Sequence, residues 1–539
     1  RFRHKNSRPF IEFDQNPKRP GKDDVLVELE LKKGCLDTCE SCGEVTITQE
    51  ESAETIVPDY CPDIARIIET DGKIFLHSRE VRDGKGEVTG AVRVTVLYTP
   101  DGESGIRTLE FAIPFTVETE GKSLPDCTVL CADTDAEYLE TRMLNPRKVF
   151  THCKLVTRFS GYRRAPLCFC TDVEAPKELC IEKRQETQHT SVISQILEKD
   201  FTFNDEFNLS PGKEGAAEIL TSRVGCAVTE AKIIGNKLVF KGVFSIQLLY
   251  RTPSGACVSA GGELPFSQIM EVGEDSEGMI PTIQLQFTGA DFQINNGADA
   301  DGRKISVVLY IHATAFLRTD RDLTLLCDLY STAYSMSYEM QPIQLTTLAE
   351  NMARRQTVRE VLEIGVVAES ILALSAACSA VTVSREGNLA TLRTGVTIRA
   401  LYLDEGGVPL VAERSIDVSC PMELPADSAV TARATCPESP QGSISAGGIE
   451  VRFPVDFQMT ATSGKKKVCL QAAKIASDTP KDLSKAPSLV LRCVGTDETL
   501  WDLAKKYNTT ISGILTANAL EDDASVPAGR LLLIPKKRA

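Results

Sequence analysis

The chain has 539 residues and a formal net charge of −15 at pH 7, because 75 acidic side chains outnumber 60 basic ones. This length exceeds what one hydrophobic core supports, so we expect about three to five domains. The acidic balance argues against a nucleic-acid partner, and no apolar stretch of about 18 residues predicts a transmembrane segment.

Residues 1–44 are predicted to form an N-terminal extension. They open with Arg1 to Asn6, which no apolar run follows, so no secretory signal is expected here; the missing initiator Met predicts further sequence upstream. The 18 cysteines are expected to be reduced thiols that pack as small apolar residues. Cys35, Cys39 and Cys42 lie closest together. Cys39 and Cys42 have the spacing of metal ligands, but no second pair of Cys or His follows nearby, so we predict no metal site.

A segment from Glu54 to Ile68 carries two aspartates at short spacing. Asp59 and Asp63 could be paired carboxylates for acid–base chemistry. Each of them follows a proline, however, which is typical of turns and of a helix cap before Ile64. We therefore predict a structural role for both aspartates.

Three strands with alternating apolar residues recur at a fixed interval. Each ends in a tyrosine, and Tyr98, Tyr250 and Tyr402 are spaced 152 residues apart (250 − 98 and 402 − 250). One face of each strand is apolar and the other is mostly polar, which is typical of a half-buried strand. The predicted strands, whose tyrosines we expect to be structural, are Val92–Tyr98, Phe244–Tyr250 and Val396–Tyr402.

Each strand is followed by a glycine-containing turn and a returning strand, which is typical of hairpins. A further alternating strand comes later in each copy, at Lys148–Phe159, Lys304–Leu317 and Ile449–Thr460. Few helices and frequent glycine turns predict a mainly β chain with three tandem antiparallel β-sandwich-like repeats. The predicted domains are 45–165, 180–338 and 343–475, with linkers at 163–178 and 340–351.

The segment from Glu54 to Ile68, together with the threefold β unit, resembles the SPOCS domain, long known only as a domain of unknown function. The motif Val-Pro-Asp…Pro-Asp-Ile is present in the first copy. The later copies match through their pattern and spacing.

Residues 489–536 form the last predicted module, after a polar, proline-bearing linker at 476–488. An apolar strand precedes Thr499, which can cap a helix whose last turn carries Lys505 and Lys506. Asn508 is expected to end this helix in a left-handed conformation, and Thr509 or Thr510 to start a second helix. A closing strand at 531–534 stops at Pro535. The order predicts a small βααβ module.

This module resembles the LysM family at Thr499-Leu-Trp501, at Ala504 to Tyr507, at 518–520 and at 527–535. The resemblance implies a groove between two loops that binds N-acetylglucosamine polymers such as peptidoglycan. Where the family usually has Gly-Asp before Thr-Leu, this chain has Asp497-Glu498, a departure that bears on sugar binding more than on the fold. The candidate contact residues are Gly495, Thr496, Asp497, Glu498, Thr499, Ala517, Asn518, Ala519 and Leu520.

Trp501 is the only tryptophan of the chain. Its helical spacing beside Leu500 and Ala504 favours a structural role in the core of the module. Direct contact with a ligand is the alternative.

Three SPOCS copies followed by one LysM module is the layout of SipL-like spore-coat morphogenetic proteins. The resemblance implies a non-enzymatic scaffold or adaptor at the forespore surface, in the mother-cell cytoplasm, whose LysM module docks a coat-basement ATPase or another coat protein; self-association of the β-domains is a further expectation. The alternative is a cell-wall protein that binds peptidoglycan. No cofactor is expected. The five histidines are scattered, and no nucleophile elbow, phosphate loop or His-Glu-x-x-His helix occurs, so no catalytic residue is predicted.

Overall fold

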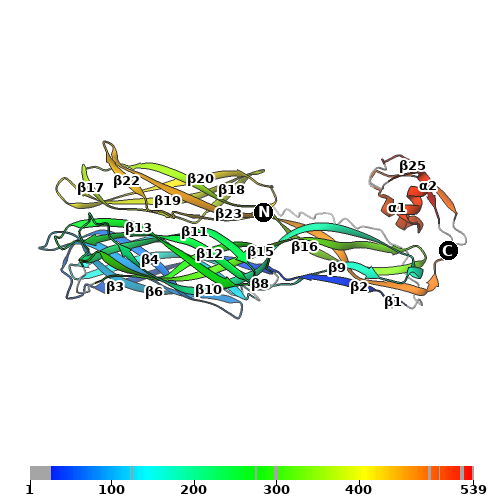
Figure 1. Ribbon diagram of the computed structural model, residues 1–539, viewed down its shortest axis with the longest axis horizontal. Coiled ribbons are helices and arrows are strands. Elements are labelled where there is room, and N and C mark those ends of the chain that lie inside the picture. Colours follow the sequence, from blue (N-terminus) through cyan, green and yellow to red (C-terminus); the bar gives the residue numbers. More distant parts are fainter. Residues whose placement is uncertain are drawn as a thin grey trace, which may run out of the picture.

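The computed structural model describes residues 26–121, 123–124, 127–273, 276–295, 301–482, 487–496, 498–521 and 527–536. Within these ranges the chain is mainly antiparallel β-sheet with two short α-helices near the C-terminus, so the predicted fold class is confirmed. No helix in these ranges is long and apolar enough to cross a membrane. Three sandwiches lie together at one end (the head), a narrower bundle of strands extends from them (the stem), and the helical module lies at the far end of the stem (Figure 1).

The head consists of three units of similar design, each with two packed sheets. In the first unit the strand orders are β4-β5-β6 and β3-β8-β7, and in the second they are β11-β12-β13 and β10-β15-β14. In the third unit β19 pairs with β17, β18 and β20, while β23 pairs with β16, β21 and β22.

The strand bounds of these units follow in chain order. The first unit has β3 (Cys39–Ile56), β4 (Ile64–Arg82), β5 (Lys85–Pro100), β6 (Arg107–Glu118), β7 (Val129–Asn145) and β8 (Lys148–Arg164). The second has β10 (Ile181–Asn208), β11 (Glu218–Ile234), β12 (Lys237–Arg251), β13 (Cys257–Glu271), β14 (Ile280–Ile294) and β15 (Lys304–Ser331). The third has β16 (Tyr334–Leu362), β17 (Ala368–Cys378), β18 (Thr382–Glu386), β19 (Leu389–Asp404), β20 (Pro409–Glu423), β21 (Ser428–Thr435), β22 (Gln441–Ser445) and β23 (Gly448–Pro480).

The three strands predicted from the 152-residue spacing are the central strands β5, β12 and β19. Their apolar faces are buried in the sandwich cores, as are Tyr98, Tyr250 and Tyr402 at their ends. The Tyr98 hydroxyl donates to the carbonyl of Pro62 at 3.3 Å, and the Tyr250 hydroxyl donates to the carbonyl of Glu214 at 3.0 Å. Both acceptors lie 36 residues before the tyrosine, so the two units use the tyrosine in the same way.

The residue before each tyrosine packs on the opposite face, where the three units meet. Leu97, Leu249 and Leu401 are at most 2% exposed and belong to one apolar cluster, together with Leu220 and Leu372. A charged contact lies on the same interface, where Arg223 of the second unit approaches Glu69 at 3.2 Å and Asp71 at 3.5 Å in the first unit. The three units are thus joined by a shared core as well as by the continuous chain.

The stem continues the outer strands of the head as three two-stranded ribbons. β10 with β15 and β16 with β23 pass through without a break, whereas the first ribbon is made of separate strands, β2 (Glu30–Leu36) and β9 (Leu167–Glu174). The strands carry register shifts at corresponding places, between 41 and 43, 193 and 195, and 348 and 350. Bulges bend a strand and increase its twist, so each ribbon changes direction where it leaves the head. β1 (Val27–Glu28) pairs with β23.

The stem has a hydrophobic core to which all three ribbons contribute. One cluster centres on Val173, Leu326, Met336 and Leu470, and a second on Phe169, Leu325, Ile343 and Cys469. Because an isolated two-stranded ribbon is marginally stable in water, each ribbon depends on the other two.

The predicted linkers and the predicted helix are wrong. Segment 340–351 lies inside β16, residues 476–480 belong to β23, and segment 163–178 contains the end of β8, all of β9 and the start of a 3₁₀-helix (Lys177–Leu179). Residues 27–44 of the predicted extension contribute β1, β2 and the start of β3. Pro342 is tolerated because β16 is an edge strand, paired only with β23. A strand, β4, and not a helix begins at Ile64.

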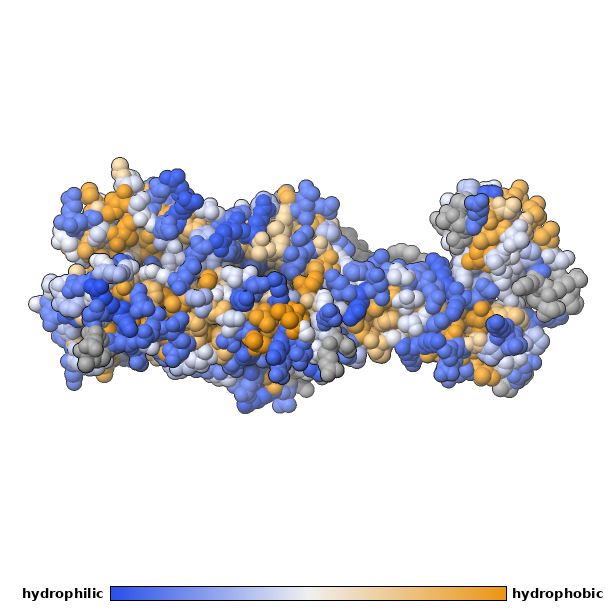
Figure 2. Space-filling view, in the orientation of Figure 1, coloured by the Kyte–Doolittle hydropathy of each residue, from blue (hydrophilic) through white to orange (hydrophobic). Residues whose placement is uncertain are grey.

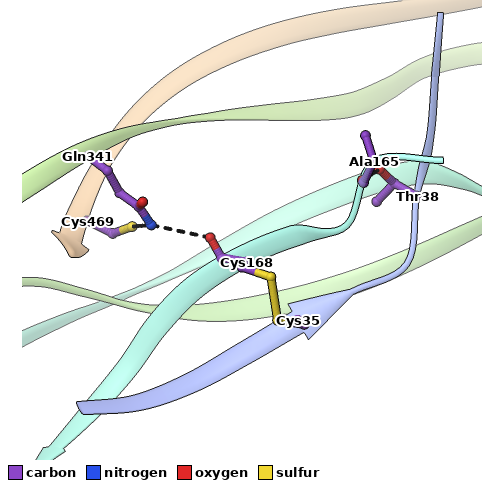
Figure 3. The surroundings of a disulfide bond; sticks show 6 residues. All are labelled: Cys35, Thr38, Ala165, Cys168, Gln341 and Cys469. Atoms are coloured by element: carbon purple, nitrogen blue, oxygen red, sulfur yellow. Dashed lines mark hydrogen bonds between the residues drawn. A yellow bond between two sulfur atoms is a disulfide. The ribbon is translucent and has the colours of Figure 1, made fainter. Parts of the chain in front are cut away.

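A disulfide joins the first ribbon. Cys35 of β2 and Cys168 of β9 are bonded across 133 residues (Figure 3), which corrects the expectation that all cysteines are reduced; the other 16 are free thiols. Next to it, Thr38 and Ala165 bond each other at the break between the strands. Gln341 of β16 donates to the carbonyl of Cys168 at 3.3 Å, which links the first ribbon to the third. No cluster of three metal-ligating side chains occurs among the described residues.

We expect Leu401→Ala to destabilise the head, because it opens a cavity in the core shared by the three units. Truncation of a buried leucine costs about 2–5 kcal/mol, measurable as a fall in the midpoint of chemical denaturation. The control is Leu389→Ala on the same strand, since Leu389 is 43% exposed and its truncation should change the free energy of unfolding by less than about 0.5 kcal/mol. Equal effects of the two variants would contradict a shared interface core.

Candidate functional site

The terminal module folds through local signals that were predicted. It consists of β24 (Leu489–Cys493), α1 (Leu500–Tyr507), α2 (Ile511–Asn518) and β25 (Leu531–Pro535), with β24 antiparallel to β25. Thr499 caps α1 in a reciprocal capping box with Asp502, and Asn508 ends α1 at a φ of 51°. Thr510, and not Thr509, is the N-cap of α2, where its hydroxyl accepts from the amide of Gly513. Asn508 at the end of α1 and Thr510 at the start of α2 fix the turn between the helices.

Trp501 is part of the module's core, as its spacing predicted. It is 7% exposed and packs with Leu500, Leu503, Ile514 and the inward residues of β25. A residue from outside the module, Tyr330 of β15, belongs to the same cluster. The core of the module therefore extends into the tip of the stem.

A single carboxylate on the stem receives two side chains of α1. The indole Nε1 of Trp501 donates to Asp328 at 2.7 Å, and Nζ of Lys505 donates to both oxygens of Asp328 at 2.6 and 2.7 Å. Lys505 also donates to the hydroxyl of Tyr338 on β16 at 2.8 Å. Burial acts to lower the pKa of Lys505, but the bonds to Asp328 and Tyr338 outweigh it and the pKa is raised. Lys505 is thus held as a cation against the stem.

The turn between α1 and α2 is bound as well. The hydroxyl of Tyr330 donates to the carbonyl of Thr509 at 2.8 Å, and its ring meets Trp501 edge-on at a centroid distance of 5.0 Å. Lys481, just beyond β23, donates to Asn508 at 2.6 Å and to the carbonyl of Ser331 at 2.8 Å. Burial lowers the pKa of Lys481 to about 8. The contact between module and stem is therefore both aromatic and polar.

The two loops predicted to contact a ligand lie away from this contact. Thr496, Thr499, Ala517 and Ala519 are exposed, and none of them bonds to the stem among the described contacts. The loop after β24 begins beside residues 529 and 530, since Val494 exchanges backbone hydrogen bonds with them. Asp497 lies outside the described residues.

Some of the predicted contact residues have structural partners within the module. Glu498 accepts from the amide of Gly495 at 3.1 Å and lies 3.5 Å from Arg492, so it shapes the first loop. The side-chain amide of Asn518 donates to the carbonyls of Ile514 and Leu533 and accepts from the amide of Leu533. Asn518 therefore attaches α2 to β25, and its polar atoms are already used. The backbone amide of Leu520 donates a hydrogen bond to the carbonyl of Leu515.

The outer face of the β24–β25 sheet is apolar and exposed. Leu489 is 54% exposed, Leu491 62%, Leu531 61% and Leu533 38%. Leu491 pairs directly with Leu533, and Cys493 pairs with Leu531, so the exposed side chains form one strip across the strands. Apolar residues are visible on the surface of the module in Figure 2.

A cavity lies in the head, between the three units. Its volume is about 870 Å³, and residues of all three units line it. Four charged residues of its lining pair with one another: Arg158 approaches Asp133 at 3.5 Å and also bonds to Asp135, while Arg433 lies 3.6 Å from Asp133. Burial raises the pKa of Asp135.

Asp59 lies in a turn, as predicted, whereas Asp63 precedes the strand β4 and caps no helix. Arg147 lies 3.2 Å from Asp59 and 3.1 Å from Asp63, and it also donates to the carbonyls of Val57 and Cys61. One arginine thus holds the whole proline-rich segment between β3 and β4.

Comparisons with known families agree with this architecture. A family model described as "SipL, SPOCS domain" matches residues 63–144 and 216–295, and a LysM domain model matches residues 494–535. The chain combines SPOCS and LysM domains. The two SPOCS segments fall on corresponding strands of the first and second units, β4 to β7 and β11 to β14.

The SipL-like recognition made from the sequence is thus confirmed, and it marks a sporulation-related protein with a module of the peptidoglycan-binding type. Both families are non-catalytic, which favours a protein that is not an enzyme. No curated protein and no solved structure matched the chain.

Sequence reasoning did not find the residues of the stem that hold the LysM module. Asp328, Tyr330, Tyr338 and Lys481 come from three different segments, and Asp328 lies 173 residues before Trp501. One signal was present, because Asp328 interrupts the otherwise apolar run from Leu325 to Tyr330.

We expect Asp328→Asn to loosen the LysM module, because the buried ammonium of Lys505 loses its anion. Hydrogen bonds to a charged group contribute about 1.5–3 kcal/mol. As Trp501 is the only tryptophan, the emission of the whole protein reports on this contact, and it should shift to longer wavelength and become more accessible to acrylamide. The control is Asp320→Asn, at an exposed position of the same strand. Identical emission and quenching in both variants would contradict the assigned contact.

The stability of the wild type should rise relative to Lys481→Met as the pH increases from about 8 to 10.5. The pKa of Lys481 falls from 10.5 to about 8 on folding, so in this window the unfolded chain binds more protons at this site, and stability rises with pH. Below pH 8 the full cost of the buried charge remains. The measurement is the thermal midpoint of the wild type minus that of Lys481→Met at pH 7, 9 and 10; a value that stays constant or falls as the pH rises would contradict the assignment.

Proposed function

We propose that this chain is a non-enzymatic adaptor of spore-coat morphogenesis, placed at the forespore surface in the mother-cell cytoplasm. The combination of SPOCS and LysM domains supports a role in sporulation. The observation that carries the proposal is the orientation of the LysM module, whose α1 face is bound to the stem while its loops and outer sheet face remain exposed.

The head and stem fit the role of a scaffold. The three units share one core, and their ribbons extend together to the point where the LysM module is bound. A rigid body of this kind holds a binding module at a fixed distance and orientation, which reduces the conformational entropy lost on binding.

We propose that the LysM module docks a coat-basement ATPase or another coat protein. The apolar strip formed by Leu489, Leu491, Leu531 and Leu533 supports a protein partner, because an exposed apolar patch is typical of an interaction surface. No cofactor is required in this role.

A second candidate function is peptidoglycan binding, which would place the protein at the cell wall. The exposed loops around Thr496, Thr499 and Ala517 support it, because the LysM resemblance implies a glycan groove between these loops. The two functions use different surfaces and can therefore be separated by substitution.

Two variants of the full-length chain test the proposal. Leu491→Asp places a charge in the apolar strip, and Ala517→Arg places a long cationic side chain beside the loops. We expect a fluorescent fusion of the wild type to encircle the forespore in sporulating cells, Leu491→Asp to disperse through the mother cell, and Ala517→Arg to localise normally.

Sedimentation with purified peptidoglycan distinguishes the adaptor function from the peptidoglycan-binding function. Strong sedimentation that Ala517→Arg abolishes and Leu491→Asp leaves intact, together with a wall-associated fusion, would replace the adaptor proposal by the cell-wall one. The emission of Trp501 in each variant serves as the control for folding.

A further inference from the structure

Two thiols of the third unit face each other at hydrogen-bond distance. Sγ of Cys378 and Sγ of Cys436 are 3.2 Å apart, although the residues are 58 positions apart in the chain. Cys378 ends β17, which pairs with β19, whereas Cys436 follows β21, which pairs with β23. The two cysteines therefore bridge the two sheets of one sandwich.

The pair is accessible to a small reagent. Both cysteines are only partly buried, and both line the cavity of about 870 Å³ between the three units. The backbone after Cys436 packs closely on the second unit, because a Cβ on Gly225 would lie 2.6 Å from the carbonyl oxygen of Pro437. The segment that carries Cys436 is thus held in place beside β17.

We propose that Cys378 and Cys436 are an oxidation site that forms a second disulfide of this protein, by exchange with a low-molecular-weight disulfide that enters the central cavity. The sulfur atoms need to approach by about 1 Å to reach the bonded distance of about 2.05 Å. We expect rotation of the two side chains about their Cα–Cβ bonds to provide a change of this size.

The chemistry of the pair assigns different roles to the two sulfurs. The hydrogen bond from Cys436 lowers the pKa of Cys378 against the opposing effect of burial, and the same bond, together with burial, raises the pKa of Cys436. The thiolate is the nucleophile in thiol–disulfide exchange, so Cys378 attacks first.

The exchange takes two balanced steps. The Cys378 thiolate bonds to one sulfur of the small disulfide, whose S–S bond breaks and releases one thiolate. Cys436 then transfers its proton to that thiolate and attacks Sγ of Cys378, which expels the second half as a thiolate that solvent protonates. Two protein thiols are oxidised, and one small disulfide is reduced to two thiols.

The second unit provides a matched control. Cys226 lies 152 residues before Cys378, at the corresponding place in β11. Its Sγ makes no hydrogen bond to a thiol among the described contacts, and burial raises its pKa to about 12. Cys42 and Cys127 are a competing pair in the first unit, where both sulfurs approach Gly161 and burial raises the pKa of Cys127 to about 11.

The test is incubation of the purified full-length protein with oxidised glutathione, followed by digestion without reductant and mass spectrometry. We expect one new crosslinked peptide pair that joins Cys378 to Cys436 and weighs two hydrogens less than its two parts, while Cys226 stays free. Cys436→Ser should trap Cys378 as a glutathione adduct, because the serine hydroxyl still donates to the thiolate. Cys436→Ala should form this adduct several-fold more slowly.

The thermal midpoint provides a second measurement. Oxidation should raise it by several degrees in the wild type, since a crosslink across a loop of this length restricts the unfolded chain, and should leave Cys378→Ser unchanged. The proposal is overturned if Cys378 and Cys436 collect separate adducts, if Cys226 reacts at the same rate as Cys378, or if only Cys42 and Cys127 become linked.

Discussion

The burial of a leucine on the outer face of each central strand organises the whole molecule. A strand that buries only one face can belong to an independent sandwich. Leu97, Leu249 and Leu401 lie on the second face, and they are buried only because the three sandwiches pack against one another. The position of the three units then brings their outer strands together, and only in that arrangement can the three ribbons share the core of the stem. The docking site of the LysM module, built from β15 and β16, follows from that assembly.

The LysM module is oriented by few residues, and most of them are on the stem. Asp328 accepts from both Trp501 and Lys505, so one carboxylate fixes the rotation of α1, and Tyr330 holds the following turn. Because the indole is used in this contact, the face of α1 that carries Trp501 is covered by the stem, whereas the loops of the module and its outer sheet face remain exposed. A protein partner on the outer sheet face and a glycan at the loops would therefore use different surfaces of the module.

The repeat, the strand patterns, the helix caps and the LysM and SPOCS resemblances could be predicted, because each depends on residues close in sequence or on spacing. The shared core was missed although its signal was present, since Leu97, Leu249 and Leu401 break the polar face at identical positions. The linkers were misjudged because the ribbons of the stem have polar outer faces and a proline on an edge strand. Asp328 and the pairing of Cys35 with Cys168 depend on contacts across more than 130 residues, which no local pattern encodes.

The continuous strands of the second and third ribbons have a mechanical consequence. β10 and β15 are 28 residues long, β16 is 29 and β23 is 33, and each runs from the head to the tip that holds the LysM module. A pulling force on that module acts along the strands, so the hydrogen bonds of a ribbon bear the load in shear, all together, and do not open one after another as they would under a peeling force. The long strands of the stem are thus arranged to resist tension between the head and the module.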